Sequence, residues 1–238
     1  MKNIKWCGYE WLPREKWGKF HPIKPYCHYD PEAIDCDEDE NLILKTHVNP
    51  KRLKHPHTKK FIKIPIGVGL ITSKKGFDYG YFEIEAKLPK GKNLWPAFWM
   101  SPFESWPPEI DVFEGYTKEK DNYFHFNWKN PFGFWRVETN FHCGKEPENY
   151  NLGAKTHWLG FKDPIKHFNK YGCLWTPDKI EIFYNGRLVR KLTDKKLLKE
   201  YHDKSMCVKI NAHVDKNVDK ENHKTTKYII KNFKYEKL

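Results

Sequence analysis

Three carboxylates lie within six residues of one another, at Glu109, Asp111 and Glu114, in a stretch that is otherwise apolar. Clustered carboxylates repel one another, and one of them then keeps a proton at neutral pH. A protonated acid beside an ionised carboxylate is the pair of catalytic groups that glycoside hydrolysis uses. The alternative is an acidic edge strand exposed to solvent, which the interleaved apolar residues and the preceding Trp-Pro-Pro run disfavour.

The spacing of the acids also carries a structural prediction. In a β-strand alternate side chains share a face, so Glu109 and Asp111 point one way while the apolar residues between them point toward a core. Glu114 has the opposite parity. A β-bulge at Val112 or Phe113 would add one unpaired residue and bring all three acids to one face. We therefore expect a bulged strand, a feature common beside active sites.

Alternating side chains identify the neighbouring strands. Residues 81–88 alternate apolar and polar, which is typical of a half-buried antiparallel strand. Residues 94–100 form the next strand, in which Trp95, Ala97 and Trp99 share one face while Phe98 and Met100 point into the core.

The rest of the chain completes an all-β pattern. Strands are expected at 41–45, 68–71, 122–143, 206–214 and 227–235, a hairpin around Asn185-Gly186 within 179–192, a surface loop at 50–63 and a short helix at 194–202. Residues 1–40 are expected to be an extended N-terminal arm on the main body. The length fits one domain over residues 1–238, folded as an antiparallel two-sheet sandwich.

The amino-acid composition indicates which chemical class of partner the protein binds. Aromatic residues make up 16% of the chain, including ten Trp, and flat apolar rings of this kind bind sugars well. The formal net charge of +12 suggests a polyanion, with sulfated or carboxylated sugars ahead of nucleic acid because no nucleic-acid-binding signature is present. We therefore expect a polysaccharide partner and no nucleic acid.

Several other classes are not indicated. The six cysteines show no metal-ligand spacing and are expected to be free thiols. Asp35, Asp37 and Asp39 imitate a calcium loop, but Glu40 replaces its glycine, so we expect no cofactor and no calcium is indicated. No membrane span is expected. The N-terminus lacks the apolar run of a secretory signal, which leaves localisation open between a trimmed secreted form, release by lysis and a virion-associated enzyme.

A set of ordered motifs resembles glycoside hydrolase family 16. They are Gly69-Leu70-Ile71-Thr72-Ser73, Tyr79-Gly80-Tyr81-Phe82-Glu83, Lys87-Leu88-Pro89-Lys90-Gly91, Trp95-Pro96-Ala97-Phe98-Trp99-Met100, Glu109-Ile110-Asp111-Val112-Phe113-Glu114-Gly115, and a later piece from His167-Phe168 through Trp175-Thr176-Pro177-Asp178 to the 185–186 turn. The resemblance implies a concanavalin-like β-jelly roll with a concave substrate cleft and retaining hydrolysis of a β-linked glycan.

The resemblance also implies roles. Glu109 matches the family's nucleophile, Glu114 its general acid/base, and Asp111 the carboxylate between them. The extra residue before Glu114 resembles the bulged subgroup of laminarinases, agarases, porphyranases and carrageenases. Pro108 stands where glycine is more usual in laminarinases.

Aromatic side chains near these acids are the expected sugar platforms. Trp95, Trp99 and Trp106 come first, and His125 and Trp128 second. Each of the three tryptophans could instead be a core residue, and His125 could be structural.

The sequence thus predicts a monomeric, endo-acting retaining hydrolase, with β-1,3-glucan as the first substrate. A β-galactan such as agar, porphyran or carrageenan is the runner-up, favoured by the charge. A non-catalytic carbohydrate-binding protein on the same fold is the alternative from another class.

Overall fold

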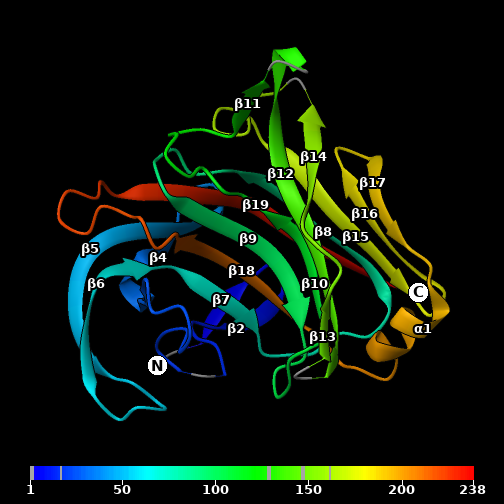
Figure 1. Cartoon of the computed structure of the whole chain (residues 1–238), viewed down its shortest axis with the longest axis horizontal. Helices are drawn as coiled ribbons and strands as arrows, with labels where there is room; N and C mark the ends of the chain where they lie inside the picture. Colours follow the sequence, from blue (N-terminus) through cyan, green and yellow to red (C-terminus); the bar gives the residue numbers. More distant parts are fainter. Residues whose placement is uncertain (1–2, 17, 128–129, 146–147, 161) are drawn as a thin grey trace.

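The computed structural model describes residues 3–16, 18–127, 130–145, 148–160 and 162–238, which form two packed β-sheets (Figure 1). The first sheet has the order β1 (Ile4–Trp6), β2 (Tyr9–Leu12), β7 (Leu70–Ser73), β18 (Cys207–Val214), β9 (Leu94–Ser101), β10 (Glu109–Glu114), β12 (Asn130–Lys145) and β11 (Phe124–Asn127). Two further strands, β13 (Glu148–Asn151) and β14 (Lys155–Gly160), both pair with β12. The acidic stretch is thus β10, well inside the sheet.

The second sheet has the order β17 (Arg187–Leu192), β16 (Lys179–Tyr184), β15 (Asn169–Thr176), β8 (Gly80–Lys87), β19 (Thr226–Lys237), β5 (Leu42–Lys54), β6 (Phe61–Val68) and β3 (His28–Tyr29), with β4 (Ile34–Cys36) on β5. Among the described strand pairs, β3–β6 is parallel and the others are antiparallel. Short helical turns lie at η1 (Pro31–Ala33), α1 (Lys195–Leu198) and η2 (Lys199–Tyr201). The predicted two-sheet sandwich is confirmed.

The core lies between the sheets and follows the expected alternation. Phe82, Ile84 and Ala86 of β8 are fully buried, as are Ile110 and Val112 of β10 from the other sheet. The Tyr184 hydroxyl donates to the Val112 carbonyl oxygen at 2.9 Å, which fixes the second sheet behind the acidic strand. The acidic strand therefore has one apolar face held in the core and one polar face turned away from it.

The turn at Asn185-Gly186 joins β16 and β17 as predicted, with φ of 51° and 78° at its two residues, the left-handed values that a two-residue hairpin turn requires. The predicted helix is also present, and Asp194 caps it by accepting the Lys196 and Leu197 backbone N–H groups at 2.8 and 3.3 Å. The six cysteines all lie in the described parts of the chain, and none of them is in a disulfide.

The predicted loop over 50–63 is wrong in part, because β5 runs to Lys54 and β6 begins at Phe61, which leaves a turn of only 55–60. The segment is rich in Lys, His and Pro, which is typical of a loop, but its apolar residues Leu53 and Ile62 pair across the two strands and point to one face. The N-terminal residues are more regular than an extended arm, since β1 and β2 add an edge to the first sheet while β3 and β4 join the second. No helix in the described parts of the chain is long and apolar enough to cross a membrane.

Candidate active site

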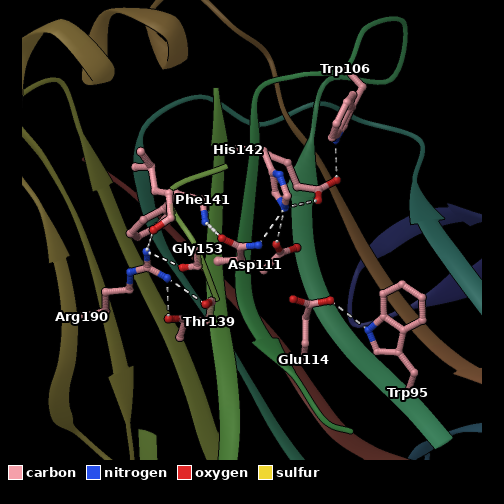
Figure 2. Close-up of polar contacts among 12 residues, drawn as sticks. Trp95, Trp106, Asp111, Glu114, Thr139, Phe141, His142, Gly153 and Arg190 are labelled. Carbon is pink, nitrogen blue, oxygen red and sulfur yellow. Dashed lines mark hydrogen bonds and ion pairs between the residues drawn. The ribbon is translucent and has the colours of Figure 1, made fainter. Parts of the chain in front are cut away.

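The predicted bulge lies in β10. Asp111 pairs with Asn140 of β12 and Glu114 with Glu138, so three steps along β10 match two steps along β12. A second register shift occurs against β9 between Asp111 and Phe113. Val112 and Phe113 consequently both enter the core, and the Phe113 ring lies 4.2 Å from that of Tyr171. The extra residue leaves all three acids on the polar face of the first sheet, as Figure 2 shows for Asp111 and Glu114.

Each outer acid has its own hydrogen-bond donors. Trp106 donates its indole N–H to Oε2 of Glu109 at 3.0 Å. At the other end, Trp95 and Tyr116 both donate to Oε1 of Glu114, at 2.9 and 2.8 Å. No described residue donates to Oε2 of Glu114, so that oxygen is the one able to carry a proton. The two outer carboxyl groups are therefore held independently and oriented differently.

His142 joins Glu109 to Asp111. Its Nε2 lies 3.5 Å from Oε1 of Glu109 and 3.4 Å from Oδ2 of Asp111 (Figure 2). The Asn140 amide fixes the ring, since its Nδ2 lies 3.0 Å from the same Nε2 while its Oδ1 accepts the Phe141 backbone N–H at 2.9 Å. Glu109 and Asp111 are also hydrogen-bonded to each other. One imidazole thus bridges two of the acids.

Burial dominates the protonation of the acids. Asp111 is 4% exposed and Glu114 is 8% exposed. Burial, followed by the charge of Asp111, raises the pKa of Glu109 well above its usual value. Burial and then the charge of Glu114 raise the pKa of Asp111 in the same way. Burial also raises the pKa of Glu114, against the hydrogen bonds from Tyr116 and Trp95. Burial and mutual repulsion thus both favour the protonated form within this cluster of acids.

A buried ion pair lies in the same sheet row. Lys209, Trp99 and Asp111 are consecutive cross-strand partners on β18, β9 and β10. Lys209 is 1% exposed and its ammonium lies 3.2 Å from the carboxylate of Glu15, which comes from the N-terminal segment. The same ammonium donates to the Ser101 hydroxyl at 2.6 Å and lies 4.3 Å from the Trp99 ring centroid. The N-terminal segment is thus part of the surroundings of the acids.

Two residues support the site from the core side. Arg190 of β17 reaches across the sandwich to β12, where its Nη1 donates to the carbonyl oxygen and the hydroxyl of Thr139 at 2.7 and 3.1 Å. Its Nη2 donates to the Gly153 carbonyl at 3.1 Å, and its guanidinium lies 4.5 Å from the Phe141 ring centroid (Figure 2). The hydroxyl of Tyr201 donates to the His142 carbonyl oxygen at 2.8 Å. These contacts fix the segment of β12 that carries Asn140 and His142.

The aromatic residues predicted to bind sugar differ in exposure and in their distance from the acids. Trp95 and Trp106 are half-buried and contact Glu114 and Glu109 directly. The Trp95 ring also stacks on Tyr116, with centroids 5.2 Å apart. Trp99 is only 8% exposed, and its indole N–H donates to Asn211 Oδ1 at 2.7 Å, which leaves little ring surface for a sugar.

The other two candidates lie elsewhere. His125 belongs to β11, opposite Phe134, and its ring packs on that of Phe134 at 5.6 Å. Phe134 is four residues along β12 from Glu138, the partner of Glu114, so His125 is displaced along the sheet from the acids. Trp128 lies outside the described residues.

Sequence reasoning missed His142, Asn140 and Tyr116. A signal for two of them existed, because Asn140 and His142 alternate with the apolar Phe141 and Cys143 along one strand. Tyr116 carried no such signal beyond lying two residues after Glu114.

The donor atoms of Glu109, Asp111 and His142 all lie within 4.8 Å of one another, so this cluster could hold a cation. Two of these ligands are the acids that the resemblance assigns to catalysis, so a metal bound there would compete with their proton.

Comparisons with known proteins agree with this geometry. An endo-1,3-1,4-beta-glycanase, ExsH, of Rhizobium meliloti is 49% identical over 131 residues, which are 52% of this chain and 23% of the relative. A glucan endo-1,3-beta-glucosidase of Cryptopygus antarcticus is 32% identical over 120 residues, covering 47% of this chain and 38% of the relative. The chain therefore spans well under half the length of these curated relatives.

Among solved structures, the catalytic domain of an endo-1,3-beta-glucanase (laminarinase) from Thermotoga petrophila superposes with a TM-score of 0.69 at 21% identity, over 89% of this chain and 83% of that one. This likeness establishes the shared fold. The model of the glycosyl hydrolases family 16 matches residues 27–230, a span that holds all strands from β3 to β18 and the three acids Glu109, Asp111 and Glu114. This chain belongs to glycosyl hydrolases family 16.

Proposed function

We propose that the protein is an endo-acting retaining glycoside hydrolase that cleaves a β-linked polysaccharide by double displacement. The observation that carries the proposal is the bulged β10, which presents Glu109, Asp111 and Glu114 on one face with separate donors on the two outer acids. Retaining hydrolysis needs two carboxyl groups about 5 to 5.5 Å apart, one as nucleophile and one as acid. The outer acids are candidates for these two roles.

In this mechanism Glu109 attacks the anomeric carbon while Glu114 protonates the leaving glycosidic oxygen. The proton resides on Oε2 of Glu114, because Oε1 already accepts from Trp95 and Tyr116. Glu114 then takes a proton from the water that releases the covalent glycosyl intermediate. Asp111 lies between the two and shares a hydrogen bond with Glu109. It can therefore carry negative charge while Glu109 is neutral in the covalent intermediate.

We propose β-1,3-glucan as the substrate. Of the two curated relatives reported above, one is named a glucan endo-1,3-beta-glucosidase and the other an endo-1,3-1,4-beta-glycanase. A neutral glucan offers flat sugar faces and hydroxyl groups. Trp95 and Trp106 contact the two outer acids and so supply an aromatic ring at each end of the triad.

One observation favours an anionic β-galactan as the second candidate. Lys24, an exposed residue of the N-terminal segment, places its ammonium 4.8 Å from the Trp95 ring centroid. The charge of Lys24 also reaches the acids, since it lowers the pKa of Asp111 against the larger raising effect of burial. A sulfated sugar stacked on Trp95 would meet this cation directly.

Product release from laminarin, agarose and carrageenan by the purified protein tests both candidates. We expect oligosaccharides from laminarin, loss of release in Glu109→Gln with an unchanged thermal midpoint, and full release in the matched control Glu104→Gln, an exposed acid five residues away. Release from agarose or carrageenan with none from laminarin would replace the glucan by the galactan. Binding to a glycan without turnover by either wild type or Glu109→Gln would replace the enzyme by a binding protein.

A further inference from the structure

The β5–β6 hairpin concentrates the positive charge of the molecule. Residues 41–68 contain seven Lys and Arg, three His and no acidic residue, in a chain whose formal net charge is +12. Lys45 and Lys51 form ion pairs with Asp35 and Asp30. The remaining five cations are Arg52, Lys54, Lys59, Lys60 and Lys63, and none of them lies within ion-pair distance of a carboxylate in the described parts of the chain. The outer half of the hairpin is therefore an uncompensated basic surface.

Strand register gathers part of this charge on one face. Arg52 pairs with Lys63 and Lys54 with Phe61 across the two strands, so these four exposed side chains share a face, which we call the tip face. Like charges directly opposite each other in an antiparallel pair are destabilising. The free protein therefore holds Arg52 and Lys63 in a mutually repulsive arrangement that a bound anion would relieve.

The tip face also has an aromatic platform. Phe61 is 59% exposed, and the guanidinium of Arg52 lies 5.4 Å from its ring centroid. A hollow beside it is lined additionally by Lys19, Phe20 and Pro56. The His55 ring packs against Phe20, which lines this hollow, with the two ring centroids 5.8 Å apart. A flat ring flanked by cations matches a sugar ring that carries sulfate or carboxylate groups.

The tip face is separate from the acids. The acids lie on β10 in the first sheet, whereas β5 and β6 belong to the second sheet. In Figure 1 the hairpin extends to the lower left, while α1 lies at the opposite, right-hand side. Occupation of the tip face therefore leaves the acids accessible.

We propose that the tip face is a second binding site, which takes an anionic polysaccharide bearing sulfate or carboxylate groups. The family of the chain favours a polysaccharide over another polyanion. This binding requires no cleavage and so does not depend on the proposed hydrolysis. It would hold the enzyme on a charged matrix while the acids act on a separate glycan chain.

Binding to dextran sulfate tests the proposal, with neutral dextran as the uncharged comparison. Dextran is α-linked, so a β-glycosidase does not consume the probe. We expect binding to dextran sulfate that weakens with salt, and no binding to dextran. Arg52→Gln combined with Lys63→Gln should weaken binding on the order of tenfold, because two charge-assisted contacts are lost. Phe61→Ala should weaken it on the order of fivefold through lost ring contact.

The matched control is Lys196→Gln combined with Lys199→Gln, which removes the same charge from exposed residues at the far side of the molecule. We expect this control to bind within about twofold of wild type, since exposed charges this far away are screened. Thermal midpoints verify folding, and Arg52→Gln and Lys63→Gln are measured singly as well.

Equal losses in the control and in the hairpin variant would overturn the site in favour of a net-charge effect. Unchanged binding by the Arg52 and Lys63 variants would overturn it outright. Binding of duplex DNA as tight as that of dextran sulfate, with no effect of Phe61→Ala, would show a polyanion surface that does not recognise sugar.

Discussion

Arg190 offers the sharpest test of how the second sheet serves the site. Its guanidinium is buried and has no ion-pair partner among the described residues, and it bonds instead to backbone carbonyls on β12 and before β14. Substitution to Met keeps much of the volume but leaves the Thr139 and Gly153 carbonyls without this donor. Thr139 is fully buried, and a buried acceptor left unpaired costs about 1–3 kcal/mol, whereas Gly153 is exposed and water can replace the donor there, so we expect a net loss of about 2 kcal/mol of unfolding free energy. For a chain of this size that lowers the thermal midpoint by about 4 to 8 °C.

The same substitution removes a positive charge behind the acids. Arg190 bonds to Thr139, which is the neighbour of Asn140, the cross-strand partner of Asp111. Its charge is thus roughly two strand spacings, or about 10 Å, from the acid, which at an effective dielectric constant near 20 corresponds to about 1.7 kcal/mol or about one pKa unit. Burial raises the pKa of Asp111, and Arg190 opposes that rise. Without the cation the acids take up protons at higher pH, so the acidic limb of kcat/KM moves upward, by up to about one unit.

Arg190→Lys separates the two effects, because lysine keeps the charge but cannot reproduce the planar fork of donors. We expect both variants to lose stability and only Arg190→Met to shift the acidic limb, measured as kcat/KM against pH on a soluble β-glucan. A Met variant that melts early yet keeps the wild-type pH profile would refute the electrostatic role and leave Arg190 as a purely structural clamp.

Three further outcomes are expected. Tyr116→Phe removes a hydrogen-bond donor to Glu114. Burial raises the pKa of Glu114 and this bond lowers it, so loss of the bond raises the pKa further, and the basic limb of kcat against pH should move up by about one unit. An unmoved limb would contradict the role of Glu114 as the acid. Tyr201→Phe leaves the His142 carbonyl without its donor and should cost about 1–2 kcal/mol in denaturant unfolding, with a loss below the experimental error counting against the brace. Prolonged dialysis against EDTA should leave activity on laminarin unchanged, because the proposed steps use carboxyl groups alone; loss restored by a divalent ion would place a metal in the mechanism.

The acids and their strand were predictable because the evidence is local. The parity of Glu114 alone required a bulge, and the register of β10 has one between Asp111 and Glu114. The turn at Asn185-Gly186 was equally local, since few residues other than Asn and Gly adopt the backbone angles it needs. Prediction worked where the constraint lies within about six residues of the chain.

Contacts between distant segments were not predictable in this way. Arg190 and Thr139 are 51 residues apart, and nothing in the local pattern around Arg190 marks it as buried. The 50–63 segment was misjudged for a different reason. Its polar composition is typical of a loop, but pairing between β5 and β6 extends the strands because backbone hydrogen bonds, not side-chain polarity, define them. Trp99 shares a face with Trp95, but its burial depends on Lys209 and Asn211 of another strand.

The buried pair of Glu15 and Lys209 bears on where this catalytic unit begins. The family match starts at residue 27, yet Glu15 lies before it and compensates a lysine in the same cross-strand row as Asp111. A protein trimmed to the matched residues would keep β10 with its three acids. It would leave the buried ammonium group of Lys209 without the Glu15 carboxylate, in the same sheet as those acids. The span matched by the family model is therefore narrower than the set of residues that balances charge around the acids, which includes Glu15 ahead of that span.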